Sequence, residues 1–316
     1  MRQLILLGFF LVSAGVGEGQ MAPQLVSRGS TEIPALQHGT AGIWSHGAWI
    51  VLSDRFSSAP LFWMYDSVGN EISKIQFTVP GAARINIYDN AFARGSDGTL
   101  AVIGTAYTND TRGTTFLAAL SPDGQQEMVV RLSPFFPNAV TVASDGTFWV
   151  AGHQWEGNKP RDHSQNLIRR YDKSGKLLGS FMPWSTINDA PHTLPPDALS
   201  TLAASEGRVA WYSRLARTHI EFSLDGKVVR RVETPEVDNA SVTSLAVCED
   251  ATFLGVSALA TDKRKASWGI YELGGHESEW KYMPQEETWG YLHGCEANRV
   301  ASRTSQTTIL WLAKTE

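Results

Sequence analysis

The chain has 316 residues, a formal net charge of -5 and a hydrophobic content of 42%. Its basic residues are scattered, which argues against a nucleic-acid partner, because such proteins present a concentrated cationic face. The length is enough to bury a core without disulfide staples, and all-β architectures of this size commonly form one domain.

The first residues have the pattern of a secretory signal peptide. Arg2 precedes the apolar run 4–12, and small residues follow at 13–15. This order of basic, apolar and small residues is typical of a cleaved leader. A membrane anchor is the weaker interpretation, because the run is shorter than the roughly 20 residues that span a bilayer. We therefore expect a leader at 1–19, a single mature domain at 20–316, no membrane span, and a secreted or periplasmic location.

A turn motif recurs along the chain with a period of roughly 50 residues, within the range of propellers and solenoids. Each copy lies between two short apolar or alternating runs, which is the pattern of two strands in a hairpin. The clearest copies read Ser-Asp-Gly or Ser-Glu-Gly, and the first residues of the six copies are Ser45, Ser96, Ser144, Ser205, Cys248 and Cys295.

A second family of turns lies out of phase with the first. The glycines that mark these turns are Gly69, Gly124, Gly175, Gly226 and, in a degenerate copy, Gly275. Two turns in each period mean four strands in each period. Six such units without a helical pattern predict an all-β fold, a six-bladed β-propeller with four-stranded antiparallel blades.

The sixth unit ends one strand short. Its predicted strands lie at 291–294, 299–302 and 308–313, and a further turn would fall beyond Glu316. The segment 24–33 has no hairpin partner of its own, so we expect it to pair beside 308–313 and close the ring. Closure removes two open sheet edges, which otherwise invite aggregation.

The segments 168–178 and 220–229 resemble the third and fourth strands of NHL-like and TolB-like six-bladed propellers. The resemblance extends over nearly all of the mature chain. It concerns architecture rather than activity, because this fold hosts lyases, lactonases, dehydrogenases and plain binding proteins. The resemblance implies a functional face where the fourth strand of one blade leads into the first strand of the next.

Carboxylates and amides lie in the predicted connections on that face. Oxygen ligands of this type suit Ca²⁺, and the lactonase-like relatives imply a divalent cation at the channel mouth. The alternative is a structural role, because Asp and Asn are also common where loops turn. The candidate metal ligands are Asp89, Asn90, Asn138, Asp197 and Glu287.

Two long connections, 152–166 and 184–197, share the same face, and long loops on a rigid scaffold often carry function. We expect Trp155 or Trp184 to be exposed at the wall of a concave pocket. The alternative is that these side chains cover the channel mouth or are ordinary loop residues. The candidate ligand-binding residues are His153, Trp155, His163, Trp184, His192 and Trp289.

The two cysteines, Cys248 and Cys295, align at the end of the innermost strand of units five and six. A disulfide between them would tie the last two blades together, and an exported protein permits one. The alternative is two small buried thiols, because a disulfide tolerates only a short Cα separation.

Three functions remain open at this stage. The first is an exported, monomeric binding protein that holds a small molecule, glycan or peptide on its loop-rich face. The second is a metal-assisted hydrolase or lyase of the lactonase-like kind. The third is a structural component of an exported protein complex. The sequence contains no Gly-x-Ser-x-Gly elbow, Gly-rich phosphate loop or Cys/His metal cluster.

Overall fold

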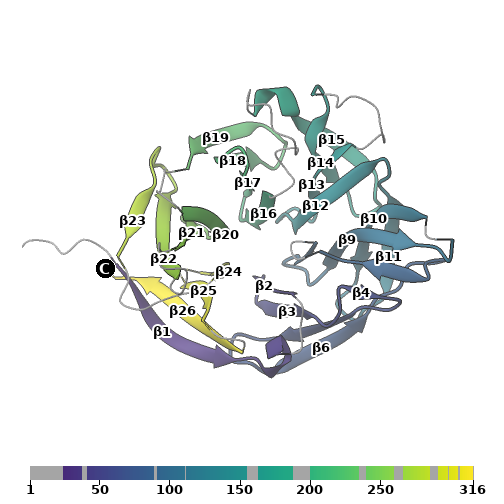
Figure 1. The fold of residues 1–316 in the computed structure, drawn as a ribbon, viewed down its shortest axis with the longest axis horizontal. Helices are drawn as coiled ribbons and strands as arrows, with labels where there is room; N and C mark the ends of the chain where they lie inside the picture. The colour runs from purple at the N-terminus through teal and green to yellow at the C-terminus, as the bar shows by residue number, and fades with distance from the viewer. Residues whose placement is uncertain are drawn as a thin grey trace, which may run out of the picture.

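The chain forms six antiparallel sheets arranged around a central axis (Figure 1). This is the six-bladed β-propeller that the turn spacing predicts. The first strand of each blade lies next to the axis, and the inner strands of neighbouring blades contact one another. The computed structural model describes residues 24–37, 41–88, 91–110, 112–154, 163–187, 200–234, 240–259, 266–284, 291–297, 299–304 and 307–315, so the predicted leader lies outside the described residues.

Four blades consist of four strands in simple succession from the axis outward. The first blade comprises β2 (Ala41–Ser45), β3 (Ala48–Leu52), β5 (Leu61–Tyr65) and β6 (Glu71–Gln76). The third comprises β12 (Phe135–Val142), β13 (Phe148–Gln154), β14 (Asn166–Tyr171) and β15 (Leu177–Pro183). The fourth comprises β16 (Ser200–Ser205), β17 (Arg208–Ser213), β18 (Thr218–Ser223) and β19 (Val228–Glu233). The fifth comprises β20 (Ala240–Val247), β21 (Ala251–Leu259), β22 (Ala266–Gly274) and β23 (Lys281–Met283).

The second blade departs from this scheme at its inner edge. One end of β9 pairs with β8, and the other end pairs with β7, so the innermost strand is split. A short strand from the first blade, β4, then pairs with β7, which the turn spacing did not predict. The strands of this sheet are β4 (Phe56–Ser57), β7 (Arg84–Asn86), β8 (Phe92–Arg94), β9 (Leu100–Tyr107), β10 (Gly113–Leu120) and β11 (Gln126–Arg131).

The sixth blade is completed by the first strand of the chain. Its strands are β24 (Tyr291–Glu296), β25 (Arg299–Arg303), β26 (Thr308–Lys314) and, outermost, β1 (Leu25–Glu32). Strand β1 runs antiparallel to β26, and Figure 1 shows the purple strand beside the yellow one. The predicted closure of the ring is therefore confirmed.

The core lies between adjacent blades. All five residues of β3 are buried, because a second strand is covered on both faces by neighbouring sheets. Trp49, Trp149 and Trp211 occupy second strands and are fully buried, as expected for side chains that fill the wedge between blades. In the part of the chain that the structure describes, two short 3-10 turns lie outside the sheets, η1 (Pro34–Gln37) and η2 (Trp184–Thr186).

Strand β1 is also held by buried polar contacts. The indole Nε1 of Trp311, in β26, donates a hydrogen bond of 3.0 Å to Thr31 Oγ1. The Thr31 hydroxyl in turn donates to the carbonyl of Ser67, at the turn of the first blade. Thr31 is 5% exposed, so both bonds are shielded from water. One threonine therefore links the closing strand to two blades.

We expect Thr31→Val to lower the free energy of unfolding by about 1–3 kcal/mol, because it leaves the Trp311 indole and the Ser67 carbonyl without this hydroxyl. Denaturant unfolding followed by tryptophan fluorescence measures the change. The matched control is Ser30→Val, an exposed position on the same strand, which should shift stability by no more than about 0.5 kcal/mol. Equal stability of the two variants would contradict the role of Thr31.

Candidate functional site: the central channel

A cavity of about 1000 Å³ follows the axis of the propeller. Its wall includes residues from the innermost strands of all six blades. Both ends of β24 contribute, Tyr291 at one end and Cys295 at the other, so the cavity extends along the whole strand. This volume is at the upper end of the range of small-molecule sites.

The channel is open because small side chains line it. Ala41, Gly42, Ala93, Ala203 and Gly294 all contribute to the wall. Larger side chains at these inward positions would fill the bore, as they fill the interior of small barrels.

One of these glycines also allows two neighbouring blades to pack closely. Gly294 has a φ of 139°, and an added Cβ would lie 2.4 Å from the carbonyl oxygen of Trp44. The absence of a side chain at this position lets blade six approach blade one beside the channel.

Two arginines line one end of the channel. Arg303 is the last residue of β25 and lies opposite Tyr291 in the strand register. Arg55 follows β3, and its carbonyl oxygen accepts a hydrogen bond from Ile87 of the second blade. Both side chains are half-buried. Burial lowers the pKa of Arg303, but a guanidinium stays protonated in the physiological range. The described wall at this end therefore carries two guanidinium groups, and Nη2 of Arg303 donates to the Leu36 carbonyl.

The opposite end is formed by the first family of turns. Its wall includes the serine hydroxyls at 45, 96, 144 and 205 together with the carboxylates of Glu206 and Glu249. Both glutamates are exposed. The described residues at this end are therefore rich in hydroxyl groups and include two carboxylates.

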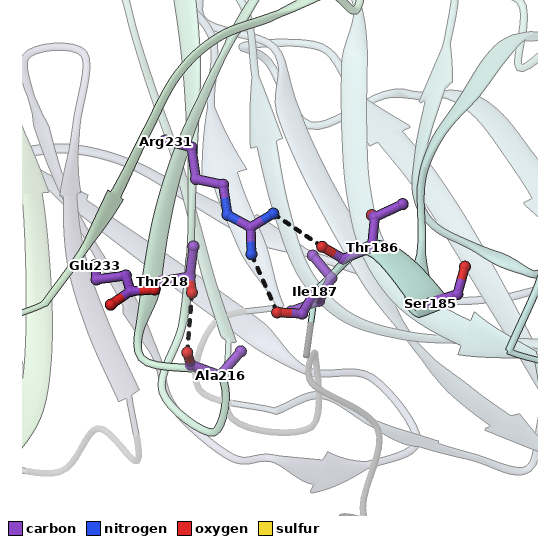
Figure 2. A pocket seen from close by; sticks show the side chains of 7 residues that line it. All are labelled: Ser185, Thr186, Ile187, Ala216, Thr218, Arg231 and Glu233. Carbon is purple, nitrogen blue, oxygen red and sulfur yellow. Dashed lines mark hydrogen bonds between the residues drawn. The ribbon is translucent and has the colours of Figure 1, made fainter. Parts of the chain in front are cut away.

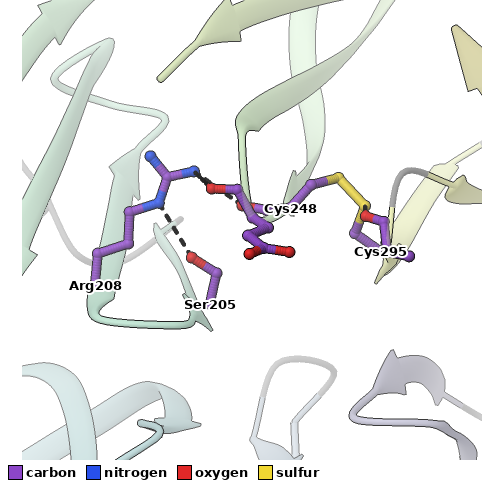
Figure 3. Close-up of a disulfide and its surroundings, with 6 residues drawn as sticks. Ser205, Arg208, Cys248 and Cys295 are labelled. Atoms are coloured by element: carbon purple, nitrogen blue, oxygen red, sulfur yellow. Dashed lines mark hydrogen bonds between the residues drawn. A yellow bond between two sulfur atoms is a disulfide. The ribbon is translucent and has the colours of Figure 1, made fainter. Parts of the chain in front are cut away.

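A disulfide joins Cys248 and Cys295 at this end, with the Cα atoms 5.2 Å apart (Figure 3). Arg208 lies beside it: Nε donates to Ser205 Oγ at 3.1 Å, and Nη2 donates to the Cys248 carbonyl at 2.9 Å. The inner ends of blades four, five and six are therefore tied together by one guanidinium and one covalent bond.

The same arginine extends into a buried ionic cluster. Arg208 Nη1 and His219 Nε2 both lie 3.1 Å from Glu221 Oε1, and Glu221 is 3% exposed. Burial raises the pKa of Glu221, but the His219 hydrogen bond and the charges of Arg208 and Arg230 outweigh it and lower the pKa overall. Arg230 also donates to the Gly274 carbonyl of blade five, so the cluster fastens a seam rather than facing the channel.

His293 is a half-buried titratable group in the channel wall. It occupies a register shift between Leu292 and Gly294, where a bulge re-aims the side chain. Nδ1 lies 2.8 Å from the Gly42 carbonyl, to which it donates, and Nε2 has no hydrogen-bond partner among the described residues. Burial lowers the pKa of His293 to about 4, and the nearby Arg303 charge contributes. The ring is therefore neutral at pH 7.

The predicted metal ligands are only partly described. Asn138 is half-buried at a bulge in β12. Within the described ranges, no three His, Cys, Asp or Glu side chains gather as a metal site. The other four candidates lie outside the described residues: Asp89, Asn90, Asp197 and Glu287. The cation stays a prediction.

The described ligand-binding candidates do not surround one point. His153 stacks on Phe136 of the innermost strand, with ring centroids 6.2 Å apart. His163 stacks on Trp184 after the outermost strand, at 4.5 Å. Trp184 is 4% exposed, so the expectation of an exposed Trp184 at a pocket wall is wrong: His163 and the blade cover its ring. Trp155, His192 and Trp289 lie outside the described residues.

A smaller hollow of about 330 Å³ lies beside η2 on the rim (Figure 2). Arg231 occupies its wall and donates to the carbonyls of Thr186 and Ile187 at 2.8 and 3.2 Å. These bonds satisfy the end of η2 and join blade three to blade four. The hollow is therefore a structural joint, and the axial channel is the better candidate site.

Reasoning from the sequence did not find Arg55, Arg303 or His293. Their one sequence signal is indirect: residues before each first-family turn are rich in Ala and Gly, as in Ala203-Ala204 and Ala41-Gly42. Such small residues in an inner strand indicate an open bore. Arg55 follows a second strand and Arg303 is the last residue of one, and no repeated motif marks either position.

Among the residues that the structure describes, no helix has the length and apolar character needed to cross a membrane. No protein-family model matches the chain, and no curated protein matches it. Solved structures do match its fold.

A Bacteroides fragilis protein described as a predicted exported protein is 10% identical, with a TM-score of 0.57, over 93% of this chain and 96% of that one. A Bacteroides vulgatus member of the duf4221 family is 9% identical, with a TM-score of 0.52, over 93% and 99%. Hydrazine synthase of Kuenenia stuttgartiensis is 10% identical, with a TM-score of 0.50, over 85% and 74%. Likenesses at this identity establish the fold alone. The chain is a six-bladed β-propeller, and its place among NHL-like or TolB-like propellers stays a prediction.

Replacing both Cys248 and Cys295 by Ser should lower the free energy of unfolding by about 2–4 kcal/mol, because the bond closes a loop of 47 residues in the unfolded chain. Guanidinium unfolding of the oxidised protein measures the loss. Reduced wild-type protein is the control and should match the double variant. Two free thiols in the unreduced protein would contradict the bond.

Protonation of His293 at acidic pH should lower the stability of the folded protein. Because folding lowers the pKa of this ring, the unfolded chain binds the proton more readily, so stability is lost as the pH falls from about 6.5 toward about 4. We expect His293→Gln to reduce this loss by about 1–3 kcal/mol, since each pKa unit corresponds to about 1.4 kcal/mol. Urea unfolding from pH 7 to 4 measures it. His276→Gln, on an exposed loop, is the control, and identical pH profiles for wild type and His293→Gln would contradict the assignment.

Proposed function

We propose that this chain is an exported binding protein that holds a small molecule in its axial channel. The observation that carries the proposal is the cavity of about 1000 Å³, whose wall is built by the inner strands, with the first family of turns at one end. Sites on strands keep their geometry without a ligand, so little ordering free energy is spent on binding.

Two features support export. The residues 1–19 have the order of a secretory leader. The Cys248–Cys295 disulfide is of a kind that persists in oxidising compartments and is rare in the cytosol. We therefore place the function outside the cytoplasm, in a secreted or periplasmic setting.

The chemistry of the wall favours binding over catalysis. The enclosed imidazole, His293, is neutral and donates to a backbone carbonyl. The best-buried carboxylate, Glu221, is committed to the cluster of Arg208 and His219. A general acid or base needs a titratable group within reach of a substrate proton; in the described wall the remaining carboxylates, Glu206 and Glu249, lie exposed at one end.

A ligand screen against a blocked channel tests the proposal. Purified mature protein is mixed with a defined set of amino acids, short peptides, mono- and disaccharides and organic acids, and ligand-observed NMR records binding. The blocked variant combines Ser96→Trp and Ala297→Trp, two exposed positions at the turn end of the cavity. The control is Ser278→Trp on an exposed loop of the rim.

We expect at least one compound class to bind wild type and the control but to lose about ten-fold or more in affinity for the blocked variant. The added indoles occupy the mouth of the channel without entering the core. Absence of any binder, or equal binding to the blocked variant, would overturn the proposal.

A further inference from the structure

A fully buried histidine lies at the seam between blades four and five. His219, in β18, is 0% exposed, and its Nε2 donates to Glu221 Oε1, 3.1 Å away. The other ring nitrogen, Nδ1, has no hydrogen-bond partner among the described residues. From blade five, the indole of Trp280 meets the ring edge-on, with centroids 5.4 Å apart. The imidazole is therefore enclosed between two blades and does not belong to the channel wall.

The charged groups around this imidazole are two cations and one anion. Glu221 accepts a hydrogen bond of 3.1 Å from Arg208 Nη1 and lies 3.6 Å from Arg230 Nη1. The titratable groups on the other packed elements are Tyr212, directly opposite in β17, and Tyr271, which packs into the same seam from blade five. Burial raises the pKa of both tyrosines, so they stay neutral in acid. At neutral pH the cluster therefore carries a net positive charge.

Protonation of His219 is unfavourable while the seam is closed. Burial lowers the pKa of His219 below its ordinary value of 6.5, although the Glu221 contact opposes this. The charges of Arg230 and Arg208 lower it further. A protonated ring would add a third cation and a second N–H donor at Nδ1, which has no partner within the described seam. The closed seam therefore excludes the proton.

The bonds that cross this seam start from the same cluster. Arg208 Nη2 donates to the Cys248 carbonyl at 2.9 Å (Figure 3), and Arg230 Nη2 donates to the Gly274 carbonyl at 2.7 Å. Both guanidiniums are also held by the carboxylate that contacts the histidine. A protonated ring gains water only if its cover moves, and the cover on the side of blade five is Trp280. The histidine, the crossing bonds and the cover are therefore parts of one joint.

We infer that the seam between blades four and five is an acid-sensitive joint, in which protonation of His219 displaces Trp280 and separates the two blades. The inner strands of these blades, β16 and β20, form part of the channel wall, so opening of the joint loosens the channel. The joint responds to acid whether or not the channel holds a ligand. Release of a bound ligand in acid is a consequence that rests on the proposed function.

Linkage sets the size of the response. An open seam gives His219 its ordinary pKa of 6.5, and the closed seam holds the pKa lower, so acid favours the open state. The ratio of open to closed molecules rises by up to about ten-fold for each pH unit below 6.5 until the pKa of the closed state is reached. Glu221 takes no part in this range: burial raises its pKa, but its contacts with His219 and Arg208 outweigh burial and bring the pKa below 4.5.

Two NMR signals from the full mature protein test the joint. Fluorine NMR of protein labelled with 5-fluorotryptophan reports the surroundings of the Trp280 indole, and Trp280→Phe assigns its signal. A correlation spectrum of the histidine ring nitrogens records the titration of His219 in the same samples. We expect the displaced form of Trp280 to increase by up to about ten-fold between pH 7 and pH 5.5, with the midpoint of the His219 titration.

One substitution removes the proton and retains the hydrogen bond. The amide of His219→Gln can donate to Glu221 but does not titrate, so the Trp280 signal of this variant should not respond to acid in the same range. The matched control is His293→Gln, which removes a histidine from the seam between blades six and one. Its Trp280 signal should respond as in the wild type.

Each outcome supports or overturns the joint. A Trp280 signal that stays unchanged in wild-type protein, an equal response in His219→Gln, or midpoints that do not coincide overturns it. If His219→Gln does not fold, the paired titrations of wild-type protein still decide. Failure of the ligand screen overturns the proposed function and the release of ligand, and leaves the acid response of the seam standing.

Discussion

The structure depends on keeping six inner strands at a fixed distance from one axis. A ring of separate sheets has no continuous hydrogen-bonded ladder, so side chains must fasten each seam. Every seam has such a bond near the axis or between turns. Around the ring these are Ser45 to the Arg94 carbonyl, Lys173 to Asp97, Gly207 to Ser144, Arg208 to the Cys248 carbonyl, Cys248 to Cys295, and His293 to the Gly42 carbonyl.

The fold could be predicted because short turn motifs within each blade specify it. Each turn needs residues that adopt its backbone angles, and Gly98, Gly146 and Gly207 all have φ between 75° and 87°. Turn glycines therefore recur with the blade period, and their phase counts four strands in each unit. The closing strand followed from the same count, because Gly69 and its later equivalents leave the last unit incomplete.

The site could not be predicted in the same way, because it belongs to no single segment. Its wall combines residues from six blades, and their inward direction depends on register. The His293 side chain reaches the Gly42 carbonyl because a bulge precedes Gly294. A single sequence gives no reliable sign of a bulge. Trp184 illustrates the opposite error: its place in a connection indicated exposure, but His163 stacks on its ring and it packs into the core beside blade three.

The pairing of β1 with β26 also determines the order in which the molecule can become complete. Thr31 and Trp311 are 280 residues apart in sequence, so a newly synthesised chain presents β1 long before its partner exists. Until then the outermost strand of the last blade has no partner. Closing a loop of this length has a large entropic cost, so the contact forms slowly. The sixth blade is therefore complete only once β26 has formed.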